Sequence, residues 1–319
     1  MSTLVLKHTS EVGTETQLES IYLLKTLFNN FLNEHDVKEN SKKTYEHSFN
    51  GFLRFVQNNN VNELNKKTLL DFKSYLTLNY SPYTANLYLG VIKQLFKYLH
   101  DNGVIKVNNV ASIKRIKEPK GFKKDSLTVA DVKALLTSVD RSVITGKRDY
   151  AILLLMITTG LRTKEIVEAC MGDVRQVSGQ YVLYVQGKGR DSKDDYVVLN
   201  EGALKAIREY KKELGKADDS APLFKSFSNR NTSGKVTTKT ISKMVKDRLA
   251  SIGIEDERIT AHSLRHTAVT LSLLAGATPQ ETQAMARHSD INTTLIYAHN
   301  IDRIGNAPEN KILDFINNG

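Results

Sequence analysis

Apolar positions recur at helical spacing through the first third of the chain. One stripe, with intervals of four, three and four residues, consists of Tyr45, Phe49, Phe52 and Val56. A second stripe consists of Leu87, Val91, Leu95 and Tyr98. Ser81-Pro82 precedes the second stripe as a helix start, and Gly103 follows it as a helix end. Because no alternating strand pattern interrupts these stripes, residues 20–105 are predicted to form a small all-helical bundle.

From residue 126 onward the pattern changes to helices mixed with two β-rich segments. Ser126 or Thr128 can cap a helix over 129–138, and a mostly buried helix from Arg148 to Thr158 ends at Gly160. The β-rich segments, Tyr181–Gln186 and Tyr196–Leu199, flank a Gly-Lys-Gly-Arg-Asp-Ser-Lys turn and predict a hairpin with a mobile basic tip. Further helices are expected at 202–214, 238–252, 261–275, 279–286 and, as a short last helix, near Tyr297. The predicted fold class is mainly α with a small β-sheet, an all-helical domain followed by an α+β domain over 126–319.

Two other segments lack clear periodicity. Residues 1–19 are polar and are expected to form a mobile tail, and residues 106–125 are expected to form a basic linker. Between Lys93 and Lys124, nine Lys or Arg residues outnumber two acidic residues, a net charge of +7 in a chain of +10. A solvated linker is the ordinary explanation, but the concentration at a domain junction favours DNA contact. The candidate DNA-binding residues are Lys93, Lys97, Lys114, Arg115 and Lys117.

Composition narrows the class of protein further. A chain of 319 residues can bury two cores, and its basic surplus suits a polyanionic partner. The single cysteine, Cys170, excludes an intramolecular disulfide framework and fits a reducing compartment. The longest apolar run, residues 151–157, is too short to cross a bilayer, and the N-terminus has no signal core. We therefore expect a soluble, cytoplasmic protein with no membrane partner.

Five residues of the second domain suggest one chemistry. Arg162 ends a Thr-Gly-Leu-Arg turn after the buried helix, Arg265 lies three residues after His262, and Tyr297 lies nine residues after His288. Arginine suits a phosphate transition state because its planar fork grips two oxygens and stays charged. A tyrosine, with a pKa of about 10, is a better leaving group from phosphorus than an alkyl alcohol, so its phosphate ester can be resealed. The set predicts attack on a DNA phosphodiester.

In order and spacing these residues resemble the tyrosine recombinases, the phage integrase family, over roughly residues 20–305. The helical bundle is similar to the family's core-binding domain, and residues 126–319 are similar to its catalytic domain with a C-terminal tail helix. The resemblance implies that Tyr297 forms a 3′-phosphotyrosyl link and that Arg162 and Arg265 stabilise the transition state. It also implies that Lys188 protonates the departing 5′ oxygen and that His262 handles the tyrosine proton. His288 then hydrogen-bonds the phosphate, and Glu165 supports the first arginine.

The resemblance also implies partners. They are double-stranded DNA with inverted-repeat sites and three further copies of the chain, as a homotetramer on two DNA sites. An accessory protein or a partner recombinase fits the same scheme. No metal or nucleotide cofactor is needed. Because only about twenty residues precede the first helical pattern, a simple Xer-like layout is expected rather than one with an additional arm-binding domain.

The motif departs from the family at one position and is ambiguous at another. The family usually has Leu-Gly before the later histidine, whereas this chain has Ala286-Arg287 before His288. Because arginine is disfavoured where φ is positive, a different local turn is expected. The hairpin also carries Arg190 and Lys193, so Lys188 is assigned from its Gly-Lys-Gly context.

Other functions fit the sequence less well. A type IB topoisomerase shares the chemistry without strand exchange, but the short chain and helical first domain disfavour it. A DNA-binding protein without catalysis is disfavoured by the complete residue set. His262 and His266 have zinc-pair spacing, but Ser263 replaces the general-base glutamate and Arg265 would repel a dication. The Gly-Lys-Gly segment lacks the first glycine and the hydroxyl of a P-loop. Taken singly, each candidate has an ordinary structural explanation, and only the ordered set favours catalysis.

Overall fold

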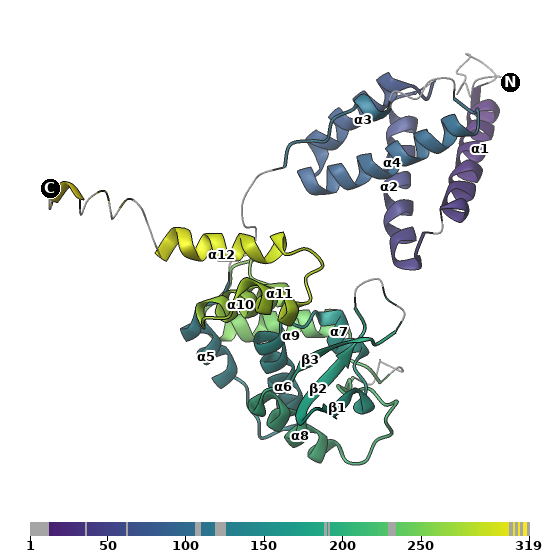
Figure 1. Ribbon diagram of the computed structural model, residues 1–319. Helices are drawn as coiled ribbons and strands as arrows, with labels where there is room; N and C mark the ends of the chain where they lie inside the picture. The colour runs from purple at the N-terminus through teal and green to yellow at the C-terminus, as the bar shows by residue number, and fades with distance from the viewer. Residues whose placement is uncertain are drawn as a thin grey trace. The chain divides into compact units, whose positions relative to one another are not determined.

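The computed structural model describes residues 13–35, 37–61, 63–105, 110–118, 126–187, 190, 192–228, 234–305, 309, 312 and 315–317. The chain divides into two compact units, Met1–Gly121 and Phe122–Gly319. Each unit has its own hydrophobic core. Figure 1 shows a purely helical first unit and a second unit in which helices surround a small sheet. The predicted fold class is confirmed.

In the described part of the first unit the α-helices are α1 (Gly13–Glu34), α2 (Glu39–Asn58), α3 (Lys66–Asn79) and α4 (Pro82–Asp101). Its core is rich in aromatic rings, such as Phe28 stacked on Phe49 with 3.9 Å between centroids. The predicted start of α4 is confirmed, because the Ser81 side chain accepts the backbone N–H of Thr84. Two expectations are wrong. Residues 13–19 belong to α1 rather than to a tail, and Leu87 is 49% exposed instead of lying on the buried stripe.

Part of the expected linker packs on α4. Residues 110–118 begin with a short 3-10 turn, Val110–Ser112, and bury Val110 and Ile113 in the helical core. The Asn86 side chain donates to the Ile116 carbonyl at 2.9 Å and accepts its N–H at 2.8 Å. Lys93 Nζ donates to the carbonyl of Ile113 at 2.9 Å. The basic side chains of this stretch are therefore presented on an ordered segment.

The second unit is built around α6 (Ile144–Thr159), which packs against α5 (Val129–Thr137), α8 (Glu201–Leu214) and α10 (Ala261–Leu274). The predicted cap of α5 is Thr128, which forms a capping box with Asp131. The remaining helices are α7 (Thr163–Glu168), α9 (Thr238–Ser251), α11 (Pro279–Ala286) and α12 (Asn292–Gly305). α7 was not predicted, and α12 is longer than expected. None of the helices among the described residues has the length and apolar character that a bilayer crossing requires.

The sheet has the strand order β1-β2-β3 and is antiparallel throughout. The predicted hairpin is confirmed as β2 (Gln180–Val185) and β3 (Asp195–Val198), with Val182 opposite Val198. The strand β1 (Val174–Val177) was missed because its four residues include only two apolar ones. Residues 188, 189 and 191 of the hairpin tip lie outside the described residues.

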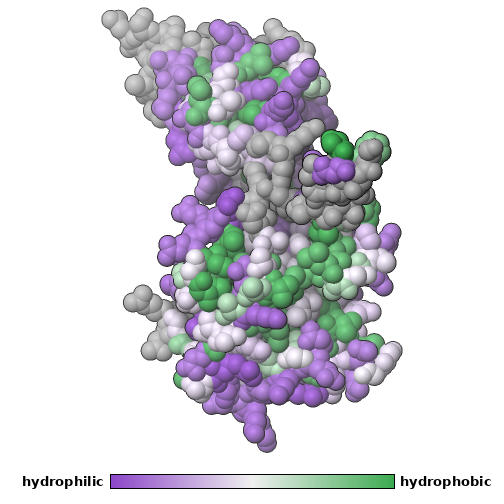
Figure 2. All heavy atoms as spheres, turned by 90° about the vertical axis from the view of Figure 1, so that its left-hand side faces the viewer, coloured by the Kyte–Doolittle hydropathy of each residue, from purple (hydrophilic) through white to green (hydrophobic). Residues whose placement is uncertain are grey.

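Several large apolar side chains stay on the surface of the second unit. Val129, Leu274 and Ile296 are each more than half exposed. The lower part of Figure 2 shows green apolar patches among hydrophilic side chains on one face of this unit. Apolar patches of this kind are typical of contact surfaces.

Candidate active site

Arg162 is held by a carboxylate one helical turn further along. It follows the left-handed turn at Gly160 (φ 63°) and occupies the N-cap of α7. Glu165 accepts the Arg162 guanidinium at 2.7 Å through Oε1 and the Arg162 backbone N–H at 2.7 Å through Oε2. The Glu165 side chain is only 3% exposed, whereas that of Arg162 remains 30% exposed. The guanidinium is thus oriented from the buried side and open on the other.

Arg265 joins two turns that are far apart in the sequence. It lies on α10, is 4% exposed, and donates to the carbonyls of Gly160, at 2.5 Å, and of Ala286. Burial, together with the neighbouring charges of Arg162 and Arg287, lowers the pKa of Arg265 to about 9. The turn before Arg162 and the end of α11 therefore meet at a buried cation.

His288 lies just after α11 and is fixed on both sides. Its Nδ1 is 2.9 Å from Thr294 Oγ1, and its carbonyl accepts the Gln283 amide at 3.0 Å. Burial and the nearby cations, Arg265 first among them, lower the pKa of His288 to about 4. The imidazole is therefore neutral at physiological pH and can form hydrogen bonds without adding charge.

Tyr297 lies on α12 and is 7% exposed, packed against Val269 and Ala286. Its hydroxyl contacts Nδ1 of His266, and the two rings are stacked at 5.5 Å. His266 lies one turn after His262 on α10, and their rings meet edge-on at 4.8 Å. The sequence reasoning weighed His266 only as a zinc ligand. Its position next to Arg265, on the face of α10 that carries His262, was the signal that could have placed it at the tyrosine.

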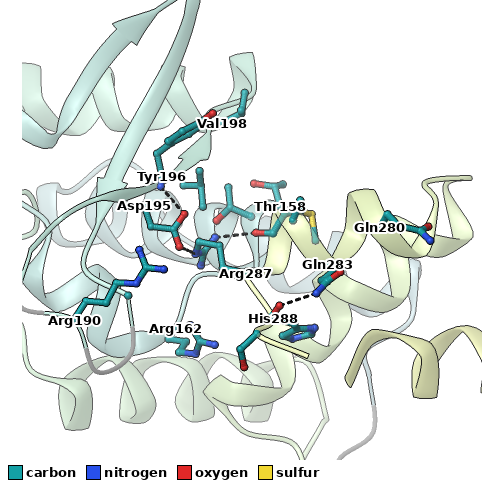
Figure 3. Close-up of a pocket in the computed structure, with 16 residues that line it drawn as sticks. Thr158, Arg162, Arg190, Asp195, Tyr196, Val198, Gln280, Gln283, Arg287 and His288 are labelled. Carbon is teal, nitrogen blue, oxygen red and sulfur yellow. Dashed lines mark hydrogen bonds and ion pairs between the residues drawn. The ribbon is translucent and has the colours of Figure 1, made fainter. Parts of the chain in front are cut away.

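A cavity of about 880 Å³ opens beside Arg162 and His288. Its walls include Arg162, Arg287 and His288, and the base of the hairpin adds Arg190 and Asp195. Figure 3 shows these side chains converging from different elements, with Asp195 beside Arg287. Cationic side chains thus line a cavity that can accept an anion. Among the residues that the structure describes, no group of three or more His, Cys, Asp or Glu side chains is arranged to hold a metal.

The predicted lysine, Lys188, lies outside the described residues. The alternative lysine, Lys193, forms contacts at the edge of the sheet. Its Nζ lies 2.5 Å from Asp173 Oδ2 and donates to the Glu168 carbonyl at 2.7 Å. Arg190 pairs with Asp194 at 2.9 Å. The other two basic groups of the hairpin therefore already have acidic partners.

Residues 125–303 match the phage integrase family, and residues 23–105 match the phage integrase N-terminal SAM-like domain. The chain belongs to the phage integrase family. A tyrosine recombinase XerD of Vibrio cholerae serotype O1 is 30% identical over 274 residues, which cover 83% of this chain and 87% of that protein. A tyrosine recombinase XerD of Listeria monocytogenes is 28% identical and covers 83% and 90%.

Solved structures show the same fold for this phage integrase family member. The XerH site-specific recombinase bound to palindromic difH substrate has a TM-score of 0.71 at 20% identity, covering 89% of this chain and 84% of that one. A lambda integrase (75–356) dimer bound to a COC′ core site has a TM-score of 0.66 at 16% identity, covering 85% and 96%. The family match and the XerD relatives make the chain a Xer-like, site-specific tyrosine recombinase, an enzyme that cleaves and rejoins DNA.

The departure from the recombinase motif before His288 has a structural outcome that differs from expectation. Arg287 adopts the left-handed conformation, with φ 55° and ψ 50°. The expectation of a different turn is therefore wrong, because this arginine occupies positive φ in place of the family's glycine. Its guanidinium donates to Glu165 Oε2 and to the Met285 carbonyl, both at 2.8 Å. These bonds hold the arginine in a backbone conformation that glycine adopts more readily.

Proposed function

We propose that this recombinase cleaves double-stranded DNA with Tyr297 as the nucleophile. The phenolic oxygen attacks a backbone phosphorus, the bond from phosphorus to the 5′ oxygen breaks, and a 3′-phosphotyrosyl link remains. A 5′-hydroxyl from a second strand then attacks that phosphorus and releases the tyrosine, so resealing consumes no ATP. The proposal is carried by one observation: α10 contributes both Arg265, bonded to the turn before Arg162, and His266, in contact with the Tyr297 hydroxyl.

Arg162 and Arg265 are assigned to charge stabilisation. Negative charge accumulates on the non-bridging oxygens as phosphorus becomes five-coordinate, and preorganised donors act most strongly where water is excluded. Arg162 is oriented by Glu165 and still 30% exposed, so it can reach a bound phosphate. His288, neutral because of its lowered pKa, adds a hydrogen bond to a phosphate oxygen.

The protons move at the two ends of the reacting phosphate. Lys188, at the hairpin tip, protonates the departing 5′ oxygen, and His262 receives the tyrosine proton. His266 positions the Tyr297 hydroxyl before the attack, because Nδ1 of His266 contacts that hydroxyl. Covalent cleavage by His262→Ala and His266→Ala tests whether both histidines take part in the reaction. We expect both to be slow, and a normal rate for His266→Ala would remove it from the reaction.

The DNA contacts of the first unit are assigned to its basic segment. Lys97 on α4 and Lys114, Arg115 and Lys117 on the docked stretch are exposed, which suits contact with backbone phosphates. Lys93 is partly buried and holds the carbonyl of Ile113. It therefore supports this segment as well as adding charge.

The assembly is proposed by likeness to the relatives. The solved XerH and lambda integrase structures are complexes with DNA, the former with a palindromic substrate. We infer that this chain binds a DNA site with inverted repeats and that a homotetramer pairs two such sites. An accessory protein or a partner recombinase can take part in the same assembly.

Trapping the covalent complex tests the proposed function. Cells that express the wild type or Tyr297→Phe are lysed under denaturing conditions, and DNA attached to the protein is sequenced. The wild type should carry DNA that ends at inverted repeats around a short spacer, and Tyr297→Phe, which lacks only the hydroxyl, should carry none while still binding that duplex. Adducts of normal yield in Tyr297→Phe would refute the assignment of the nucleophile.

A further inference from the structure

Arg287 is placed where stability alone would favour glycine. Its backbone lies in the left-handed region, with φ 55°, and its side chain is only 6% exposed. Glycine adopts this backbone conformation without a steric penalty. The guanidinium also has a buried Nε for which the described residues provide no hydrogen-bond partner. A strained backbone and a buried, incompletely paired cation both oppose folding, so the side chain requires another explanation.

The side chain shares one carboxylate with Arg162. Oε1 of Glu165 accepts Arg162 at 2.7 Å, while Oε2 accepts Arg287 at 2.8 Å. Oε2 also accepts the Arg162 backbone N–H at 2.7 Å, so the carboxylate binds the Arg162 guanidinium through Oε1 alone and not in a bidentate pair. Glu165 contributes one buried negative charge, whereas Arg162, Arg265 and Arg287 contribute three positive charges. The cluster therefore has an excess of positive charge.

The same guanidinium faces the hairpin. Its Nε lies 4.0 Å from Asp195 Oδ2, at the first residue of β3. Figure 3 shows Arg287 between Asp195 and the segment that leads to His288. Arg287 therefore contacts three parts of the site. It reaches the Arg162 turn through Glu165 and the base of the hairpin through Asp195, and it precedes His288 in the chain.

We propose that Arg287 is a positioning residue for the cleavage reaction, which rests on the proposed function of this site. By pairing with Oε2 of Glu165 it shares the single negative charge of that carboxylate, so that Arg162 is less fully neutralised and keeps its free edge for the scissile phosphate. By facing Asp195 it holds the base of the hairpin beside the phosphate site. The residue replaces the glycine usual in the family and adds a third arginine behind the two that bind phosphate.

The test compares Arg287→Gly and Arg287→Lys with the wild type on the duplex recovered by covalent trapping, nicked in its spacer so that cleavage is irreversible. Arg287→Gly should melt no lower than the wild type, because φ is relaxed, and should bind the duplex equally well. Its single-turnover cleavage should be at least about tenfold slower, as expected for a lost contribution to transition-state charge. Arg287→Lys keeps the positive charge but not the planar guanidinium, so its cleavage rate should lie between those of the wild type and Arg287→Gly.

A second substrate separates positioning of charge from simple structural support. A scissile phosphate with one non-bridging oxygen replaced by methyl carries no negative charge and needs less cationic stabilisation. On this substrate the cleavage rate of Arg287→Gly should be less than about threefold below that of the wild type, because the contribution that the variant lacks is electrostatic. A deficit of the same size on both substrates would mean that the side chain only supports the fold, and would overturn the proposal.

Other outcomes are equally decisive. Cleavage at the wild-type rate by folded Arg287→Gly overturns the proposal. If Arg287→Gly melts below the wild type, Arg287→Gln is assayed at a temperature at which it is folded, and a wild-type rate there overturns it as well. Failure of the wild type itself to form an adduct, alongside Tyr297→Phe, would count against the proposed function and not against Arg287 alone.

Discussion

Arg162 and Arg265 lie in different environments, although both are expected to bind one phosphate. Arg265 is buried, donates to two carbonyls, and has a pKa lowered to about 9 by burial and by its cationic neighbours. Arg162 is partly exposed and paired with Glu165. A bound phosphate would offset the mutual repulsion of these cations, so their arrangement favours an anionic ligand over the empty site.

Replacing either arginine with alanine is expected to slow covalent cleavage at least about a hundredfold, as for removal of one transition-state donor. The variants should differ in stability. Arg265→Ala leaves the carbonyls of Gly160 and Ala286 without their donor, at roughly 1–3 kcal/mol for each buried group, whereas Arg162→Ala leaves Glu165 paired with Arg287. Urea unfolding and single-turnover cleavage measure the two effects. Arg208→Ala on α8, whose guanidinium lies over the Tyr181 ring at 4.8 Å, is the control and should cleave normally.

The leaving-group proton is expected to come from Lys188. Lys188→Ala should cleave slowly, and a substrate whose 5′ oxygen is replaced by sulfur should restore the rate, because a thiolate leaves without a proton. Lys193→Ala should show no such rescue, since Lys193 is bonded to Asp173. Rescue of Lys193→Ala and not of Lys188→Ala would move the role to Lys193.

His288 should make the stability of the protein depend on pH. Its pKa is about 4 in the folded state against 6.5 for an ordinary histidine, because burial and neighbouring cations disfavour its protonation. Below about pH 6.5 the unfolded chain gains a proton that the folded chain does not, so stability is complete above that pH and falls towards pH 4. Urea unfolding at pH 7 and pH 5 should show a larger loss for the wild type than for His288→Gln. An equal loss would contradict this origin of the pH dependence.

At the scale of elements, the stretch 110–118 is a docked part of the first unit rather than a free linker. Its apolar residues Val110 and Ile113 enter the core, and Asn86 bonds the backbone at Ile116. This docking fixes the backbone that carries Lys114, Arg115 and Lys117. Phosphate contacts made by fixed side chains need less ordering on binding than those of a flexible chain.

Neutralising Lys114, Arg115 and Lys117 with glutamine is therefore expected to weaken binding about equally on all DNA sequences. The slope of log affinity against log salt should fall by up to about three, roughly one unit for each lost phosphate contact. The same changes at Lys205, Lys212 and Lys216 in and after α8, which lies at the end of the second unit far from α12 in Figure 1, are the matched control. An unchanged slope in the first variant would return this stretch to a solvated, non-binding role.

At the scale of the whole molecule, the end of the chain presents an apolar surface. The described residues after α12 include Ile312, Phe315 and Ile316 in helical conformation, and they are 59%, 79% and 69% exposed. We propose that these side chains dock on a neighbouring protomer rather than on their own domain. Exposed apolar side chains that gather in one place are typical of contact surfaces.

Deleting residues 309–319 is expected to leave binding of the monomer to a single site intact. It should abolish pairing of two DNA sites and reduce strand exchange, because the segment would link each catalytic unit to its neighbour. Gel mobility and recombination assays measure these steps, and thermal unfolding checks the fold of the truncated protein. Substituting Phe315 and Ile316 with serine is a milder variant that should show the same pattern. Normal recombination by the truncated protein, or its unfolding, would contradict an assembly role.

Local patterns were sufficient to predict much of this protein from the sequence. Helical stripes, the Ser81-Pro82 start, the Thr128 cap and the hairpin strands depend on neighbours within a few residues, and the structure contains them except for Leu87, which leaves its stripe. The family and its chemistry followed from the order and spacing of a few polar residues. Short elements such as β1 and α7 escaped prediction, since too few residues carry their pattern.

Only the tertiary structure decided how distant segments complete the site. The contact of His266 with Tyr297, the two carbonyls held by Arg265, and the carboxylate of Glu165 shared with Arg287 each join residues that are 21 to 122 positions apart. The sequence determined which groups are available, because helix periodicity and caps are local. It did not determine their partners, because burial and pairing of charges depend on which elements pack together. Arg287 illustrates the difference: its sequence position predicted a changed turn, and a guanidinium bound to a distant carboxylate keeps the turn left-handed.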